Sequence, residues 1–146
     1  MKVIKDILSK VNKMVLCTVR EGRPWAATVF FAYDNDLNLY FFSVKEARHS
    51  RDIARNKYVA GAISSEHKRG LAEPFHKGLQ FEGMCELVGK KNAAKYYVLY
   101  ERQHPRIRDF HDKKDAGEEL YKVRVSKWVL FDTSKNPIRR EIKWRS

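Results

Sequence analysis

The chain has 146 residues, with 43% hydrophobic and 12% aromatic residues, and 30 Lys and Arg against 18 Asp and Glu give a formal net charge of +12. This length allows one domain over residues 1–146 with a sizeable core, and the apolar content argues against disorder. No apolar run reaches the roughly 20 residues of a membrane-spanning helix, and the N-terminus lacks the continuous apolar region of a signal peptide. We expect a cytoplasmic protein.

Hydrophobic periodicity separates helices from strands along the chain. Helical spacing predicts helices over residues 2–13, 47–55 and 92–103, with a further helical turn at 107–110. Stretches rich in β-branched and aromatic residues predict strands over residues 14–19, 24–33, 37–42, 58–63, 77–88, 120–125, 128–132 and 141–144. Polar residues predict a loop over 64–75 and a connector over 112–117.

Two features of this order indicate how the strands assemble. The stretches 28–33 and 37–42 flank the turn Asp34–Asp36, which is typical of a hairpin. Helices are inserted among the strands and do not alternate with them, which favours a mainly β protein with an antiparallel barrel of six to seven strands. The interior of so small a barrel is filled by side chains, so a ligand must lie in a groove outside it.

Candidate binding residues follow the strand that ends at Phe42. Ser43, Lys45, Arg48, His49 and Arg51 lie in a loop and at the start of the next helix. Unpaired backbone N–H groups and the helix dipole favour an anion at a helix start, and nearby cations strengthen that preference. The pattern predicts a pocket for a phosphate-bearing cofactor. The alternative is an ordinary solvated helix start with surface cations.

The order and spacing of these segments resemble the FMN-binding split β-barrel family, which includes the pyridoxamine 5'-phosphate oxidases. The nearest resemblance is to a branch of small bacterial proteins of unassigned activity. Residues 14–132 are covered, and the matching stretches are 17–24, 28–34, 39–43, 48–49, 56–60 and 78–83.

The resemblance implies an FMN site in a groove between the subunits of a homodimer. Phosphate contacts are expected from Ser43, Arg48 and His49, with Arg51 as a second-rank candidate. The isoalloxazine would lie against Thr28, Val29 and Phe30, and a later strand would approach it with Lys77 and Gln80. For these strand residues, a role in the core or on a solvent-facing strand is the alternative.

Two departures from the family pattern qualify that expectation. His49 stands where lysine is usual, and Ala27 stands near an arginine of the pyridoxamine oxidases. These departures imply either a lower flavin affinity or a different cofactor. The C-terminal Arg-x-His-Asp-Arg motif is missing, which disfavours pyridoxamine phosphate oxidation itself.

The resemblance favours a flavin-dependent oxidoreductase acting on a small molecule, with no side chain assigned as catalytic. A flavin- or haem-binding carrier or sensor without turnover is one alternative, and a basic nucleic-acid-binding barrel is the other. His67, His76, His104 and His111 lack metal-ligand spacing, and no metal site is expected. Cys17 and Cys85 are expected to be reduced, buried thiols. Tyr96, Tyr97 and Tyr100 are expected to pack.

Overall fold

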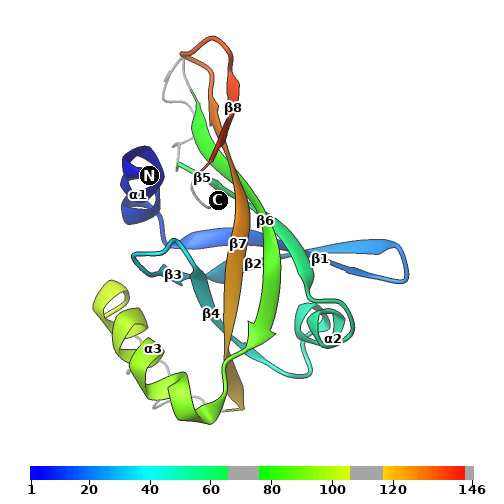
Figure 1. Cartoon of the computed structure of the whole chain (residues 1–146). Coiled ribbons are helices and arrows are strands. Elements are labelled where there is room, and N and C mark those ends of the chain that lie inside the picture. Colours follow the sequence, from blue (N-terminus) through cyan, green and yellow to red (C-terminus); the bar gives the residue numbers. More distant parts are fainter. Residues whose placement is uncertain (66–75, 106–116, 144–146) are drawn as a thin grey trace, which may run out of the picture.

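The computed structural model describes residues 1–65, 76–105 and 117–143 (Figure 1). The expected helical turn at 107–110 and most of the expected loop and connector lie outside these residues. The helices are α1 (Lys2–Lys10), α2 (Arg48–Arg55) and α3 (Lys90–Gln103). The strands are β1 (Lys13–Arg20), β2 (Arg23–Phe30), β3 (Ala32–Tyr33), β4 (Leu39–Val44), β5 (Tyr58–Ser64), β6 (Lys77–Leu87), β7 (Glu118–Asp132) and β8 (Arg139–Ile142).

All described strands belong to one antiparallel sheet, in the order β2-β1-β5-β6-β7-β4-β3, and β8 pairs with β7. The two ends of this order, β2 and β3, are consecutive in the chain and separated only by Phe31. The same extended segment therefore pairs with β1 up to Phe30 and with β4 from Ala32. The sheet is curled, and the expected mainly β split barrel is confirmed.

The expected hairpin forms only near its turn. Tyr33 pairs with Leu39 and Ala32 with Tyr40, while β2 pairs along its whole length with β1. The turn is closed by the carboxylate of Asp34, which accepts hydrogen bonds from the backbone N–H groups of Asp36 and Asn38 at 2.9 Å. Apolar content indicated a strand correctly, but it did not specify the partner of that strand.

β7 is one strand of 15 residues where the sequence predicted two pieces. Against β6, Glu82 pairs with Lys127 and Gly83 with Val125, so Ser126 is an extra residue in a β-bulge. This extra residue shifts the alternation of buried and exposed side chains, which explains the apparent gap. A Cβ on Gly83 would collide with the carbonyl of Arg124, so the bulge requires glycine there.

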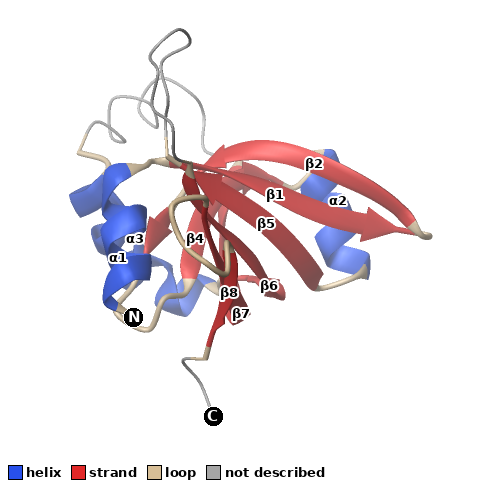
Figure 2. Cartoon of the chain, turned by 90° about the horizontal axis from the view of Figure 1, so that it is seen from above, coloured by secondary structure: helices blue, strands red, loops and turns tan. Residues whose placement is uncertain are grey.

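The barrel core is filled by large apolar side chains, including the fully buried Trp128, Phe41 and Leu16. Helix α1 covers the core through Ile4 and Leu8. Both views place α2 on the opposite side of the molecule from α1 and α3 (Figures 1 and 2). Within the described residues, every helix is too short or too polar to cross a bilayer.

The tyrosines of α3 pack as expected. Tyr96 stacks on Tyr40 with ring centroids 4.7 Å apart, and the ring of Tyr97 meets Phe42 edge-on. Tyr100 is only 2% exposed. These contacts dock α3 onto β4, beside the region where β2 and β4 separate.

Candidate functional site

A groove with a volume of about 730 Å³ lies where β2 and β4 diverge. Beyond the pair formed by Ala32 and Tyr40, β4 pairs only with β7 among the described strands, so β2 presents an open edge to this space. On such an edge, every second residue directs its N–H and C=O away from the paired neighbour. The groove thus combines apolar walls with free backbone groups.

Five of the residues predicted from the sequence line this groove. They are Thr28, Val29, Phe30, Ser43 and His49. The strand expected to contact the ring and two of the residues expected to contact the phosphate therefore share one cavity, although they come from different elements. Contact with a flavin remains a prediction for each of them.

Ser43 and His49 form a hydrogen-bonded pair in the wall of the groove. The Ser43 Oγ lies 2.7 Å from the His49 Nε2, and Ser50 donates to the Ser43 Oγ at 3.1 Å. When the Nε2 of His49 carries no proton, the Ser43 hydroxyl donates to it. When His49 is protonated, it donates to Ser43, whose hydroxyl can turn to the Val44 carbonyl at 3.4 Å. The pair is satisfied in both protonation states.

Burial lowers the pKa of His49 below its ordinary value of 6.5, because desolvation penalises the charged imidazolium. The negative charge of Asp52 acts in the opposite direction and is the smaller effect. A phosphate in the groove would favour the protonated form, as Asp52 does. His49 is therefore a weaker cation than the lysine usual at this position.

Arg48 lies next to His49 in sequence but is not among the residues that line the groove. Its guanidinium stacks on Trp25 of β2, with Cζ 4.3 Å from the ring centroid. The Arg48 Nε is 3.7 Å from the Oδ2 of Asp52, which is completely buried. The cation is thus held between an aromatic face and a carboxylate.

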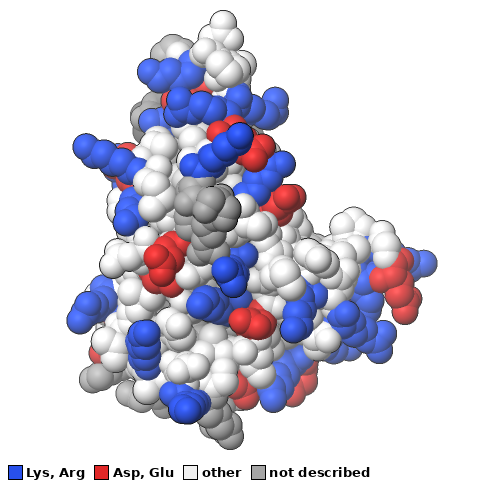
Figure 3. Space-filling view, in the orientation of Figure 1, with Lys and Arg blue, Asp and Glu red and all other residues white. Residues whose placement is uncertain are grey.

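The other cations of this region are more exposed. Arg51 is exposed on α2 and is not among the residues that line the groove, and Lys45 forms an ion pair with Glu119 at 3.7 Å. The net charge is not gathered in one stripe on the face drawn in Figure 3, where acidic and uncharged side chains lie between the basic ones.

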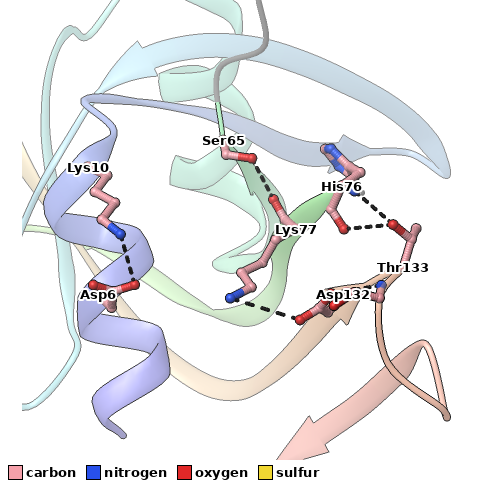
Figure 4. A network of polar contacts seen from close by, with 8 residues as sticks. Asp6, Lys10, Ser65, His76, Lys77, Asp132 and Thr133 are labelled. Atoms are coloured by element: carbon pink, nitrogen blue, oxygen red, sulfur yellow. Dashed lines mark hydrogen bonds and ion pairs between the residues drawn. The ribbon is translucent and has the colours of Figure 1, made fainter. Parts of the chain in front are cut away.

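Lys77 and Gln80 lie outside the groove lining of this chain. They are three residues apart on β6, so their side chains point to opposite faces of the sheet. The Lys77 Nζ lies 3.9 Å from the Oδ2 of Asp132, near α1 (Figure 4). Gln80 is exposed on the outer face. Their contact with a flavin stays a prediction, and one ligand on one face cannot meet both.

The end of α3 forms a wall of the groove that was not predicted from the sequence. Gln103 donates from Nε2 to the Tyr33 carbonyl at 2.7 Å and accepts from the Tyr33 N–H at 3.0 Å, as a neighbouring strand would. His104 donates from Nε2 to the Phe31 carbonyl at 2.5 Å. A glutamine followed by a histidine at a helix end carries no sequence signal for this role, since the partners are backbone atoms about 70 residues away.

The outer face of the sheet is unusually apolar. Paired residues on neighbouring strands point to the same face, and two rows run across β2, β1, β5 and β6 in this way. The rows are Thr28–Val15–Ala62–Gln80 and Ala26–Cys17–Ala60–Glu82. Cys17 is half-buried on this face, whereas Cys85 is fully buried; both are free thiols, so the expected burial is complete only for Cys85.

The family model described as pyridoxamine 5'-phosphate oxidase matches residues 1–132. The chain belongs to this family. Over 95 residues it is 28% identical to the UPF0306 protein plu4501 of Photorhabdus laumondii, which covers 64% of each chain. The match thus spans slightly less than two thirds of that relative.

Solved structures of this family's fold include proteins with different ligands in their names. An FAD-binding protein of Mesorhizobium loti has a TM-score of 0.70 at 14% identity, covering 97% of this chain and 93% of that one. The haem storage protein HutZ of Vibrio cholerae has a TM-score of 0.69 at 17% identity, covering 86% and 89%. At these identities the likeness shows the fold alone.

Proposed function

We propose that the groove between β2 and β4 binds FMN and that the protein is a flavin-dependent oxidoreductase acting on a small molecule. The observation that supports this most is the shared cavity of Thr28–Phe30 and the Ser43–His49 pair. The first set offers apolar side chains and an open strand edge for a planar ring. The second offers polar donors for a phosphate, and the residues lie in the order that the family resemblance implies.

The residues present fit the two chemically different ends of FMN. Val29 and Phe30 provide apolar surface for the ring, and free N–H and C=O groups of β2 suit its polar edge. Ser43 and protonated His49 can donate to phosphate oxygens. A bound flavin would supply the hydride or electron transfer, while the chain would bind and orient it and limit its contact with water.

The groove favours a flavin over haem. Axial haem ligation by a histidine requires a free ring nitrogen directed at the iron. The Nε2 of His49 is engaged by Ser43 and that of His104 by the Phe31 carbonyl. Haem ligation through either Nε2 would break one of these hydrogen bonds, whereas FMN needs no histidine to bind a metal. A flavin carrier or sensor without turnover is the second candidate, because none of the described side chains is assigned a catalytic role.

We further propose a homodimer in which a second copy covers the apolar outer face. Large side chains are exposed here in the isolated chain, with Val15 39%, Phe30 52% and Tyr58 68% exposed. Exposed apolar surface of this extent is typical of an interface. Thr28 borders both this face and the groove, so the partner would close the groove from outside.

FMN titration of the purified protein tests the proposal. The parent should bind FMN with a flavin absorbance spectrum, and the double variant Arg48→Ala/His49→Ala should lose several kcal/mol, since hydrogen bonds to charged groups contribute about 1.5–3 kcal/mol each. Arg55→Ala, an exposed cation on the same helix, is the matched control. Equal FMN affinity of the parent and the double variant would rule out the phosphate assignment. Haem binding with a shifted Soret band, and no FMN binding, would rule out the flavin.

A further inference from the structure

Asp52 is a buried charge at the centre of a group of polar residues beside the groove. Its side chain is completely buried, on the face of α2 that packs against β1. Thr18 of β1 donates to its Oδ2 at 2.9 Å. A carboxylate in such a place must be paired or neutralised, because desolvation of an isolated charge is very costly.

Two arginines pair with this carboxylate from different elements. The Nε of Arg20, at the end of β1, lies 3.2 Å from Oδ1, and the Nε of Arg48 lies 3.7 Å from Oδ2. The two guanidinium groups carry two positive charges and the Asp52 carboxylate carries one negative charge, so the cluster has a net charge of +1. Arg20 is the closer partner, so it balances Asp52, and the charge of Arg48 remains available to another anion.

The orientation of Arg48 agrees with this division. Its Nε is buried, yet 32% of its side chain is exposed, so the exposed part lies elsewhere on the side chain. Among the described residues, none accepts a hydrogen bond from its two terminal amino groups, which are the donors that bind phosphate. Trp25 supports the flat face of the guanidinium at 4.3 Å and limits its rotation.

We propose that Asp52 and Trp25 are positioning residues that hold Arg48 ready for the flavin phosphate, and that Arg20 preserves the charge of Arg48 by neutralising Asp52. This inference rests on the proposed FMN site. It adds three residues, none of which needs to touch the ligand. Arg48 would reach the phosphate from outside the groove lining and would act beside the Ser43–His49 pair.

A comparison of FMN with riboflavin, which lacks the phosphate, tests the proposal. Calorimetric titration of both ligands into the full-length parent, Trp25→Leu, Arg20→Gln and Asp52→Asn gives a ratio of affinities for each protein. In the parent, FMN should bind more tightly than riboflavin. Each variant should lower this ratio by about tenfold, the effect of weakening one charge-assisted contact, while leaving riboflavin affinity unchanged. Arg55→Gln should keep the parental ratio.

The ratio of FMN affinity to riboflavin affinity distinguishes a positioning role from a merely structural one. Loss of a structural residue would lower the affinity for both ligands and leave the ratio unchanged. Asp52→Asn is expected to reduce stability, so Trp25→Leu and Arg20→Gln carry the test, since both side chains are partly exposed. If the parent prefers FMN and these two variants keep the full preference, the inference is wrong and the FMN site stands. If the parent binds FMN no more tightly than riboflavin, both the phosphate site and the inference are wrong.

Discussion

Arg48 and His49 are neighbours in one helix, yet they occupy opposite kinds of environment. Arg48 lies in a charged cluster, with a buried carboxylate and an aromatic ring as partners. His49 lies against the hydroxyl of Ser43 in a groove wall, and burial lowers its pKa. Consecutive residues of a helix point about 100° apart, so adjacent cations need not act as one unit.

The difference separates a permanent charge from a conditional one. Arg48 stays charged at any physiological pH, and its position depends on an ion-pair network. His49 becomes a cation only when it takes up a proton, and it keeps its hydrogen bond either way. A phosphate held between them would feel one constant attraction and one that depends on pH.

The largest expected effect comes from removing the carboxylate of the charged cluster. Asp52→Ala should lower the free energy of unfolding by about 3 kcal/mol, at the low end for breaking a buried ion pair because both arginines are partly exposed. Urea denaturation measures this. Asp6→Ala, which removes an exposed pair with Lys10, should cost less than about 0.5 kcal/mol. Equal losses in the two variants would contradict the network.

The conditional charge can be made permanent by His49→Lys. At pH 8 this variant should bind FMN about 1–2 kcal/mol more tightly than the parent, because a charged donor replaces a neutral imidazole. The gain should shrink as the pH falls and His49 becomes protonated. The second ionisation of the phosphate affects both proteins alike, so the ratio of their affinities is the quantity to follow. A ratio independent of pH would show that His49 does not contact the phosphate.

Removing the hydroxyl that supports the Ser43–His49 pair should have a moderate effect on stability. Ser50→Ala removes the buried donor to the Ser43 Oγ and should cost about 1 kcal/mol of stability. Thermal unfolding of the variant beside Ser126→Ala, whose hydroxyl is exposed, provides the comparison. A smaller loss for Ser50→Ala than for Ser126→Ala would contradict a structural role for this chain of hydroxyls.

The smallest expected effect is a pH dependence of stability. The pKa of His49 is lower in the folded protein than the ordinary 6.5, so the unfolded chain takes up a proton first as the pH falls. The contribution of His49 to stability is thus fully present above pH 6.5 and is lost below it. His49→Gln should flatten this part of the stability profile in urea titrations at several pH values. An unchanged profile would mean that His49 is not desolvated.

Much of this architecture could be predicted from the sequence, because element type follows from local patterns. The strands of the barrel, the short helix after Ser43 and the packing tyrosines are such cases. The partner of a strand is not a local property, so the expected hairpin of residues 28–33 with 37–42 forms only at Ala32 and Tyr33. Lys77 and Gln80 were grouped although strand alternation already separates them. The roles of Trp25 and Asp52 depend on contacts between elements and have no local signature.

The passage of one strand from β1 to β4 at Phe31 makes the length of that segment critical. The two ends of the sheet are joined there by covalent bonds, so a slip of β2 against β1 would require a matching slip of β3 against β4. Deleting Phe31 would move the side chains on one side of the junction to the opposite face of the sheet. The groove and the core would then exchange residues, and neither could be repaired by a change of rotamers.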